Sequence, residues 1–130
     1  MSETQQLEFH SLDLKPEILK ALDEKGYTHA TPIQTESIPH LLEGRDLLGQ
    51  AQTGTGKTAA FALPILNKIT NDKRTQVLIL APTRELAGQV ADSIMLYSKF
   101  MPGIEVLSLY GGQGYNEQLR GLRKGAQICV

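Results

Sequence analysis

The segment AQTGTGKT, at residues 51–58, constrains the fold of this 130-residue chain more than any other stretch. It follows a short apolar run and precedes a helical pattern, and it fits the P-loop form A-x-x-x-x-G-K-T, with Ala51 where the strictest form has glycine. Gly54 and Gly56 allow the backbone to curl so that several N–H groups point into one cavity. The start of the following helix adds a positive dipole end at the same place. We therefore predict a strand, loop and helix that together hold phosphate groups.

Two side chains of this loop carry specific chemistry. Lys57 supplies a positive charge to the β and γ oxygens, and the Thr58 hydroxyl is placed to bind Mg²⁺. The remaining loop positions contribute backbone groups; they are Ala51, Gln52, Thr53, Gly54, Thr55 and Gly56. The alternative, a plain Gly-Thr-Gly turn between a strand and a helix, does not use the lysine or the threonine. The motif indicates a nucleotide and leaves kinases, GTPases, transporter ATPases and motors open.

Hydrophobic periodicity and capping residues predict the remaining elements. Helices are expected at about 16–25, 31–43, 57–69, 84–99 and 116–124, and strands at 46–50, 77–80, 104–109 and 127–130. After residue 45, strands alternate with helices, which predicts an α/β fold with a parallel sheet and helices on both faces. Val77–Leu80 is an uninterrupted apolar run, so we expect burial on both faces. Helix faces built on Leu86, Val90 and Ile94, and on Leu119 and Leu122, are expected to face inward.

Composition narrows the classes of protein and site. A net charge of −1 gives no global attraction to polyanions, so any nucleic-acid contact must be local. The single cysteine, Cys129, excludes a disulfide within the chain and a cysteine-based zinc site. The three histidines have no spacing that suggests a shared metal. No leader or membrane span is recognisable, which favours the cytoplasm. We expect one domain from residue 9 to residue 130, with residues 1–8 loose, and a chain truncated within its last strand.

Two residues near the N-terminus have both a structural and a functional interpretation. Thr31-Pro32-Ile33-Gln34 has the pattern of a capping box, in which Gln34 is the third helical residue. As an exposed amide, Gln34 can also pair with an adenine edge, since it donates and accepts at once. Phe9 either packs into the core or stacks on a base. From these residues alone, capping and core packing are the favoured alternatives.

Two later segments are equally ambiguous when each is taken by itself. Pro82-Thr83-Arg84-Glu85-Leu86-Ala87 lies where a predicted strand ends and a helix begins, the edge at which α/β sheets collect ligands. Thr83 and Arg84 there either hold a backbone phosphate or form a helix cap with surface charges. Gly111-Gly112 is either a simple turn or a place where a nucleic-acid backbone approaches closely.

Taken together, these segments resemble the DEAD-box family of ATP-dependent RNA helicases, and bacterial cold-shock members in particular. The resemblance runs from Phe9 to Val130 through GYTHATPIQ at 26–34, AQTGTGKT, PTRELA at 82–87 and GG at 111–112. It implies a RecA-like fold of the P-loop NTPase class, with ATP and Mg²⁺ as cofactors. It also implies that Gln34 contacts the adenine edge and that Phe9 stacks on the ring. Single-stranded RNA is implied as a partner without sequence preference, contacted by Pro82, Thr83, Arg84, Gly111 and Gly112.

The chain departs from the family pattern by what it lacks. The Asp-Glu-Ala-Asp segment, the TPGR segment and the second RecA-like domain do not occur in these residues. We therefore expect bare strand edges that favour self-association. An N-terminal helicase fragment, inactive alone, is the leading hypothesis. A non-catalytic nucleotide- or RNA-binding module is the alternative, and a different P-loop enzyme such as a small kinase is the third.

Overall fold

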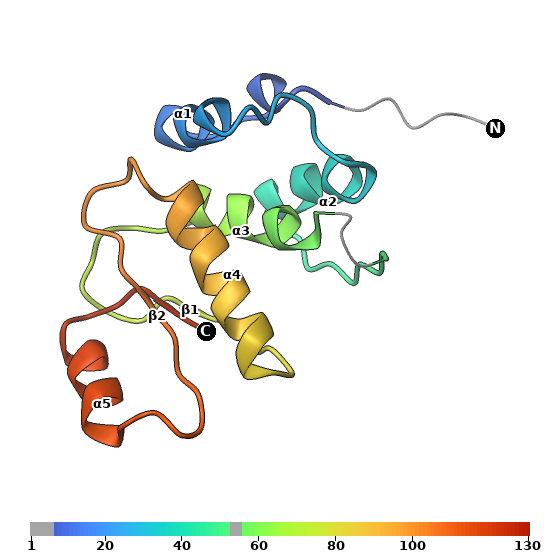
Figure 1. Ribbon diagram of the computed structural model, residues 1–130. Helices are drawn as coiled ribbons and strands as arrows, with labels where there is room; N and C mark the ends of the chain where they lie inside the picture. Colours follow the sequence, from blue (N-terminus) through green and yellow to red (C-terminus); the bar gives the residue numbers. More distant parts are fainter. Residues whose placement is uncertain (1–6, 53–55) are drawn as a thin grey trace. The chain divides into compact units, whose positions relative to one another are not determined.

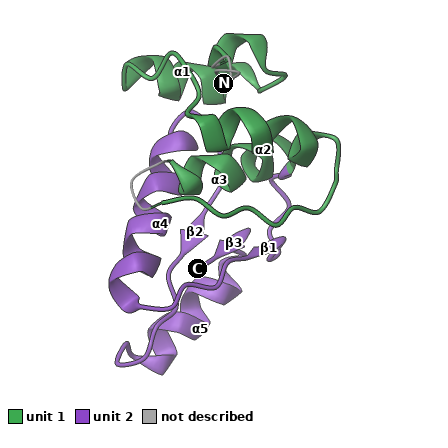
Figure 2. Ribbon diagram, turned by 90° about the vertical axis from the view of Figure 1, so that its right-hand side faces the viewer, with its two compact units in different colours: residues 1–68 green, residues 69–130 purple. Residues whose placement is uncertain are grey.

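The chain forms two compact units, residues 1–68 and 69–130 (Figure 2). The computed structural model describes residues 7–52 and 56–130. A single domain from residue 9 to residue 130 is predicted from the sequence, whereas the structure divides after Lys68. Figure 1 labels the elements along the chain. No helix in the described ranges is long and apolar enough to cross a membrane.

The first unit consists of helices. A short 3-10 helix η1 (Phe9–Ser11) is followed by α1 (Pro16–Glu24), α2 (Pro32–Leu42) and α3 (Lys57–Lys68). Pro16 and Pro32 each stand in a first turn, where the missing N–H has no intrahelical partner to lose. α2 packs against α3 (Figure 1), and α3 also contacts α1. Buried apolar side chains come from all four helices; the largest are Ile18, Leu22, Ile38, Leu63 and Leu66.

One side chain of α3 fixes the segment that precedes α1. The Asn67 carboxamide accepts a hydrogen bond from the Lys15 N–H at 2.8 Å and donates one to the Asp13 carbonyl at 3.1 Å. These groups lie before the start of α1, where backbone polar groups lack helical partners. The contact therefore joins the two ends of the first unit's sequence and orients α1 relative to α3.

The second unit is a small parallel sheet with helices. Its elements are β1 (Val77–Leu78), α4 (Arg84–Tyr97), β2 (Val106–Leu107), α5 (Tyr115–Arg123) and β3 (Ile128–Cys129). The strand order is β1-β3-β2, with both pairs parallel and Ile128 opposite both Val77 and Val106. This arrangement confirms the predicted α/β class with a parallel sheet. The buried Gln127 side chain accepts from the Glu105 N–H and donates to the Gly103 carbonyl, so it ties β3 to the chain entering β2.

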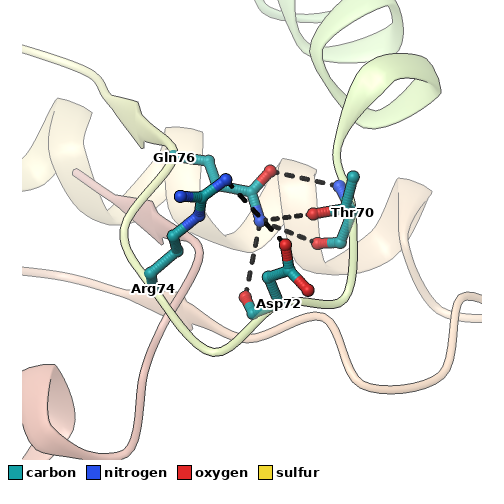
Figure 3. Close-up of polar contacts among 4 residues, drawn as sticks. All are labelled: Thr70, Asp72, Arg74 and Gln76. Atoms are coloured by element: carbon teal, nitrogen blue, oxygen red, sulfur yellow. Dashed lines mark hydrogen bonds and ion pairs between the residues drawn. The ribbon is translucent and has the colours of Figure 1, made fainter.

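A second glutamine closes the loop that enters β1. Figure 3 shows the Gln76 carboxamide directed into the turn formed by residues 70–75. Its Oε1 accepts from the Thr70 N–H at 3.1 Å, and its Nε2 donates to the Thr70 carbonyl at 2.9 Å and to the Thr70 hydroxyl at 3.0 Å. Arg74 and Asp72 form a loose, exposed ion pair across the same turn at 3.9 Å. The Gln76 carboxamide thus closes this turn together with a backbone hydrogen bond from the Arg74 N–H to the Asp72 carbonyl at 2.8 Å.

Two strand predictions are wrong. Residues 46–50 form no strand, because an isolated strand leaves its N–H and C=O groups unpaired and the described strands all lie in the second unit. The apolar run 77–80 is not buried on both faces, since the Leu80 side chain is 86% exposed and Leu78 is also exposed. β1 lies at the edge of the sheet, and successive side chains of a strand point to opposite faces, of which only one is covered.

The helix faces are only partly as predicted. Val90 and Ile94 of α4 are buried, but Leu86 is 38% exposed because it lies in the first turn, beyond the part of the helix that covers the sheet. No residue of α5 is buried, so the prediction that Leu119 and Leu122 form a buried, inward-facing side of this helix is wrong. α5 instead approaches β2 through Gly121, where an added Cβ would lie 2.5 Å from the Leu107 side chain.

Candidate nucleotide site and nucleic-acid surface

The last residues of the P-loop make a sharp turn at Gly56, and helix α3 begins directly after it. Gly56 has φ +86°, a left-handed conformation that L side chains rarely adopt, and α3 begins at the next residue. Lys57 is exposed and Thr58 half-buried at this N-terminus, where backbone N–H groups are free for an anion. Ala51 and Gln52 lead into the loop without forming a strand. Thr53, Gly54 and Thr55 lie outside the described residues.

Gln34 joins the start of α2 to this turn. Its Oε1 accepts from the Thr31 N–H at 3.0 Å, which is the glutamine half of the predicted capping box. Its Nε2 donates to the Gly56 carbonyl, also at 3.0 Å. The residue is only 5% exposed. A carboxamide has two donor hydrogens and two acceptor lone pairs, so within the described ranges these two bonds leave one N–H and one lone pair for another group.

The close approach of Gln34 also explains why residue 56 is a glycine. A Cβ at this position would lie 2.3 Å from the Gln34 Nε2 and 3.0 Å from the Thr31 hydroxyl oxygen. That hydroxyl oxygen is buried and, among the described residues, has no well-formed hydrogen bond. The capping residues and the P-loop turn therefore form one polar contact, with an acceptor still open.

Phe9 is brought to the same end of the first unit by a short pairing of backbones. The Phe9 N–H donates to the Thr28 carbonyl at 2.9 Å, the Ala30 N–H donates to the Leu7 carbonyl at 2.7 Å, and Glu8 and His29 form an antiparallel bridge. This pairing places Phe9 beside the segment that leads into α2. The ring is 3% exposed, which agrees with the core-packing alternative.

A cavity of about 310 Å³ opens beside Lys57. It is lined mostly by apolar groups; the lining residues are Ile33, Ser37, Leu41, Leu47, Gly49, Lys57, Ala60 and Phe61. Apart from Lys57, this lining offers few hydrogen-bond donors to phosphate oxygens. The candidate position for phosphate is therefore the helix start at Gly56 and Lys57, with the cavity next to it.

In the second unit, Thr83 is the N-cap of α4. Its hydroxyl accepts from the Leu86 N–H at 3.1 Å, which confirms the capping alternative for this residue. Pro82 and Thr83 are both exposed, and Arg84 is the first helical residue. Capping uses the Thr83 side chain as an acceptor and leaves the hydroxyl proton available to a second group.

Arg84 connects this helix start to the glycine pair. Its Nη2 donates to the Gly111 carbonyl at 2.6 Å, and its guanidinium carbon lies 5.1 Å from the centre of the Tyr110 ring. Gly112 has φ +90°, and a Cβ there would lie 2.9 Å from the same Nη2. The structure thus brings PTRELA and GG together, although 27 residues separate the two hydrogen-bonded positions.

Sequence reasoning missed two participants of this cluster. Tyr110 provides the ring over which Arg84 lies, and Gln118 of α5 donates from Nε2 to the Tyr110 carbonyl at 2.9 Å. Tyr110 could have been identified from its sequence position, directly before Gly111 and Gly112. Gln118 had no sequence signal, because its partner is a backbone carbonyl eight residues away.

Comparisons with known proteins agree with this arrangement. The model of the DEAD/DEAH box helicase family matches residues 31–130. Two curated relatives, both called ATP-dependent RNA helicase DeaD, come from Klebsiella pneumoniae and Escherichia coli K12. They are 59% and 58% identical to this chain over 123 residues. Those residues make up 94% of this chain, and 19% and 20% of the two relatives, so the chain spans about a fifth of their length.

A solved structure shows the same fold. It is a DEAD box protein from the hyperthermophile Methanococcus jannaschii, with a TM-score of 0.90 and 38% sequence identity. The match covers 97% of this chain and 35% of the solved chain. The family model matches more than half of the residues of the present chain, which therefore belongs to the DEAD/DEAH box helicase family.

Proposed function

We propose that these residues supply the ATP-binding loop and part of the RNA-binding surface of an ATP-dependent RNA helicase. The observation that best supports the proposal is the hydrogen bond from Gln34 to the Gly56 carbonyl. Because of this bond, a side chain that can pair with an adenine edge lies against the turn that would hold the phosphates. The DeaD relatives are ATP-dependent RNA helicases by name, which supports both ligands.

In the nucleotide site, the open N–H and lone pair of Gln34 would pair with the adenine edge, and Phe9 would support the base. Backbone N–H groups of residues 51–56 would hold the phosphates together with the Lys57 ammonium. Thr58 would bind Mg²⁺, which neutralises phosphate charge when present. The positive φ of Gly56 and the helix start that follows it fit such a group.

On the second unit, Pro82, Thr83, Arg84, Gly111 and Gly112 would contact the sugar–phosphate backbone of a single RNA strand. All five are exposed, and Arg84 carries the positive charge. Contacts of this kind give affinity without reading the bases. In the whole helicase, ATP binding and hydrolysis would drive capture, local unpairing and release of RNA.

The test compares the ATP and GTP affinities of Gln34→Glu and Gln34→Ala with those of the unchanged chain, using fluorescent nucleotide analogues. Gln34→Glu keeps an acceptor for the Thr31 N–H but cannot donate, so the cap survives while the adenine contact is lost. We expect the preference for ATP to fall about two- to tenfold in both variants, the equivalent of one hydrogen bond. Gln50→Ala, which removes an exposed glutamine, is the matched control. An unchanged ATP:GTP ratio in both Gln34 variants would refute the adenine contact.

The alternative function is a non-catalytic binding module, and one sequence fact favours it for these residues alone. The 130 residues contain no Asp-Glu-Ala-Asp segment, whose carboxylates the family uses on the metal and water. A single-turnover assay on the 130-residue chain should therefore show nucleotide binding without hydrolysis above background. Measurable hydrolysis would require a carboxylate within this chain that we have not identified.

A further inference from the structure

Two neutral groups contact the guanidinium of Arg84. The Gly111 carbonyl accepts one N–H at 2.6 Å, and the Tyr110 ring lies 5.1 Å from the guanidinium carbon. Neither group carries a charge, so neither cancels the positive charge of Arg84. A guanidinium has five N–H donors in a fixed fork, of which the carbonyl uses one. The remaining donors stay available on an exposed side chain.

The backbone that carries the Tyr110 ring is itself held by α5. Gln118 of α5 donates to the Tyr110 carbonyl at 2.9 Å and lies within 3.3 Å of the Gln113 amide oxygen. Gly112 allows the turn to lie against Arg84, because a side chain there would collide with Nη2. A free arginine side chain loses rotamer freedom when it binds, whereas one already stacked has less freedom to lose.

We propose that Tyr110 is a positioning residue of the RNA surface, which preorganises the Arg84 guanidinium for a phosphate of single-stranded RNA. This inference rests on the proposed RNA-binding function. It adds a residue outside PTRELA and GG and assigns its role to the ring face. The Tyr110 hydroxyl takes no part, so phenylalanine can replace it.

The experiment measures binding of fluorescein-labelled oligouridylate to the 130-residue chain by anisotropy, over a series of salt concentrations. Tyr110→Leu should weaken binding about two- to fivefold, which corresponds to one exposed cation–π contact. Tyr110→Phe should restore the affinity. Tyr115→Leu, which removes a more exposed tyrosine five residues further on, is the matched control and should bind like the unchanged chain.

The salt dependence separates positioning from charge. Arg84→Ala removes a phosphate contact, so the slope of log K against log salt should become shallower by about 0.7. Tyr110→Leu keeps the charge and should leave the slope unchanged. The Arg84 Nε–Hε resonance reports the stack without RNA: it should shift in Tyr110→Leu and stay in place in Tyr110→Phe.

The two hypotheses fail differently. If the unchanged chain does not bind the oligonucleotide, or if Arg84→Ala binds as well as it does, the RNA-binding function is wrong. If Arg84→Ala weakens binding but Tyr110→Leu does not, only the role of Tyr110 is wrong. Weak binding by both Tyr110→Leu and Tyr110→Phe would also overturn it, since the ring would then not be the group that matters.

Discussion

At the scale of single residues, Gly56 is subject to two independent constraints. Its φ of +86° lies in the region that favours glycine, and the space where a Cβ would stand is taken by the Gln34 carboxamide. The first constraint acts on the backbone and the second on the contact with α2. The positive φ alone favours glycine, and a Cβ would in addition displace the Gln34 carboxamide from its contact with this turn.

We predict that Gly56→Ala lowers the free energy of unfolding by about 1–2 kcal/mol, the usual cost of a left-handed alanine, and abolishes detectable nucleotide binding. Urea unfolding and fluorescent nucleotide titration measure the two effects. Gly88→Ala is the control, because nothing lies within 4 Å of a Cβ there and the position is inside α4. It should stabilise the chain by about 0.5–1 kcal/mol. Equal stability and binding in Gly56→Ala would contradict both constraints.

Local chemistry at the residue scale was predictable, and contacts between distant residues were not. The glutamine half of the capping box joins Thr31 and Gln34, three residues apart, and the sequence pattern favoured it. The Thr83 cap also spans three residues, but the sequence left it open beside a phosphate contact. The bond from Gln34 to Gly56 joins residues 22 apart and depends on how α2 packs against α3. For the same reason the family resemblance, and not periodicity, linked Gln34 to the nucleotide loop.

At the scale of elements, helices were easier to predict than strands. The predicted helix ends lie within two residues of the observed ones, because proline, glycine and capping residues mark them locally. Strands need partners, so the run at 46–50 is irregular and the other three shorten to two residues each. The loop between α3 and β1 depends instead on a single side chain, Gln76 (Figure 3).

We predict that Gln76→Ala destabilises the chain by about 1–2 kcal/mol, because the Thr70 N–H and carbonyl lose their partner in a largely exposed turn. Thermal unfolding measures the change. Gln89→Ala removes an exposed glutamine from α4 and should be neutral within about 0.5 kcal/mol. If the two variants unfold alike, the turn does not need the Gln76 carboxamide.

The cap of α4 makes a separate prediction. Thr83→Ala removes the acceptor for the Leu86 N–H and should cost about 1 kcal/mol, whereas Thr83→Ser should retain most of the stability. Urea unfolding followed by circular dichroism measures both. A full loss in Thr83→Ser would mean that the threonine methyl group, and not the hydroxyl, stabilises this helix start.

At the scale of the whole molecule, the candidate residues divide between the two units. The nucleotide-binding positions all precede Lys68 and the RNA-binding positions all follow Ile69. Leu48 in the first unit and Leu78 and Leu80 in the second are exposed, Leu78 within the edge strand β1 and the other two outside any strand. Self-association through such segments therefore remains a prediction of the structure.

We predict that Leu80→Lys reduces the concentration-dependent association of this chain, because a lysine in the exposed segment that continues the edge strand β1 opposes pairing with another copy. Static light scattering over a range of concentrations measures the mean mass. Met95→Lys, which places the same charge at an exposed position on α4, is the control and should leave the mass unchanged. A similar decrease in both variants would indicate general charge repulsion instead of a strand edge.

The contact of Gln34 with Gly56 has a consequence for engineering nucleotide preference. To make the site accept an unnatural purine nucleotide, the first residue to exchange would be Gln34, which is proposed to contact the base. Here an exchange to a residue without a side-chain N–H donor also leaves the Gly56 carbonyl without its partner, and a residue without an acceptor removes the helix cap as well. Altered base preference and weakened loop geometry are therefore inseparable in any such substitution at this position. An orthogonal nucleotide would require a second, compensating donor to the Gly56 carbonyl.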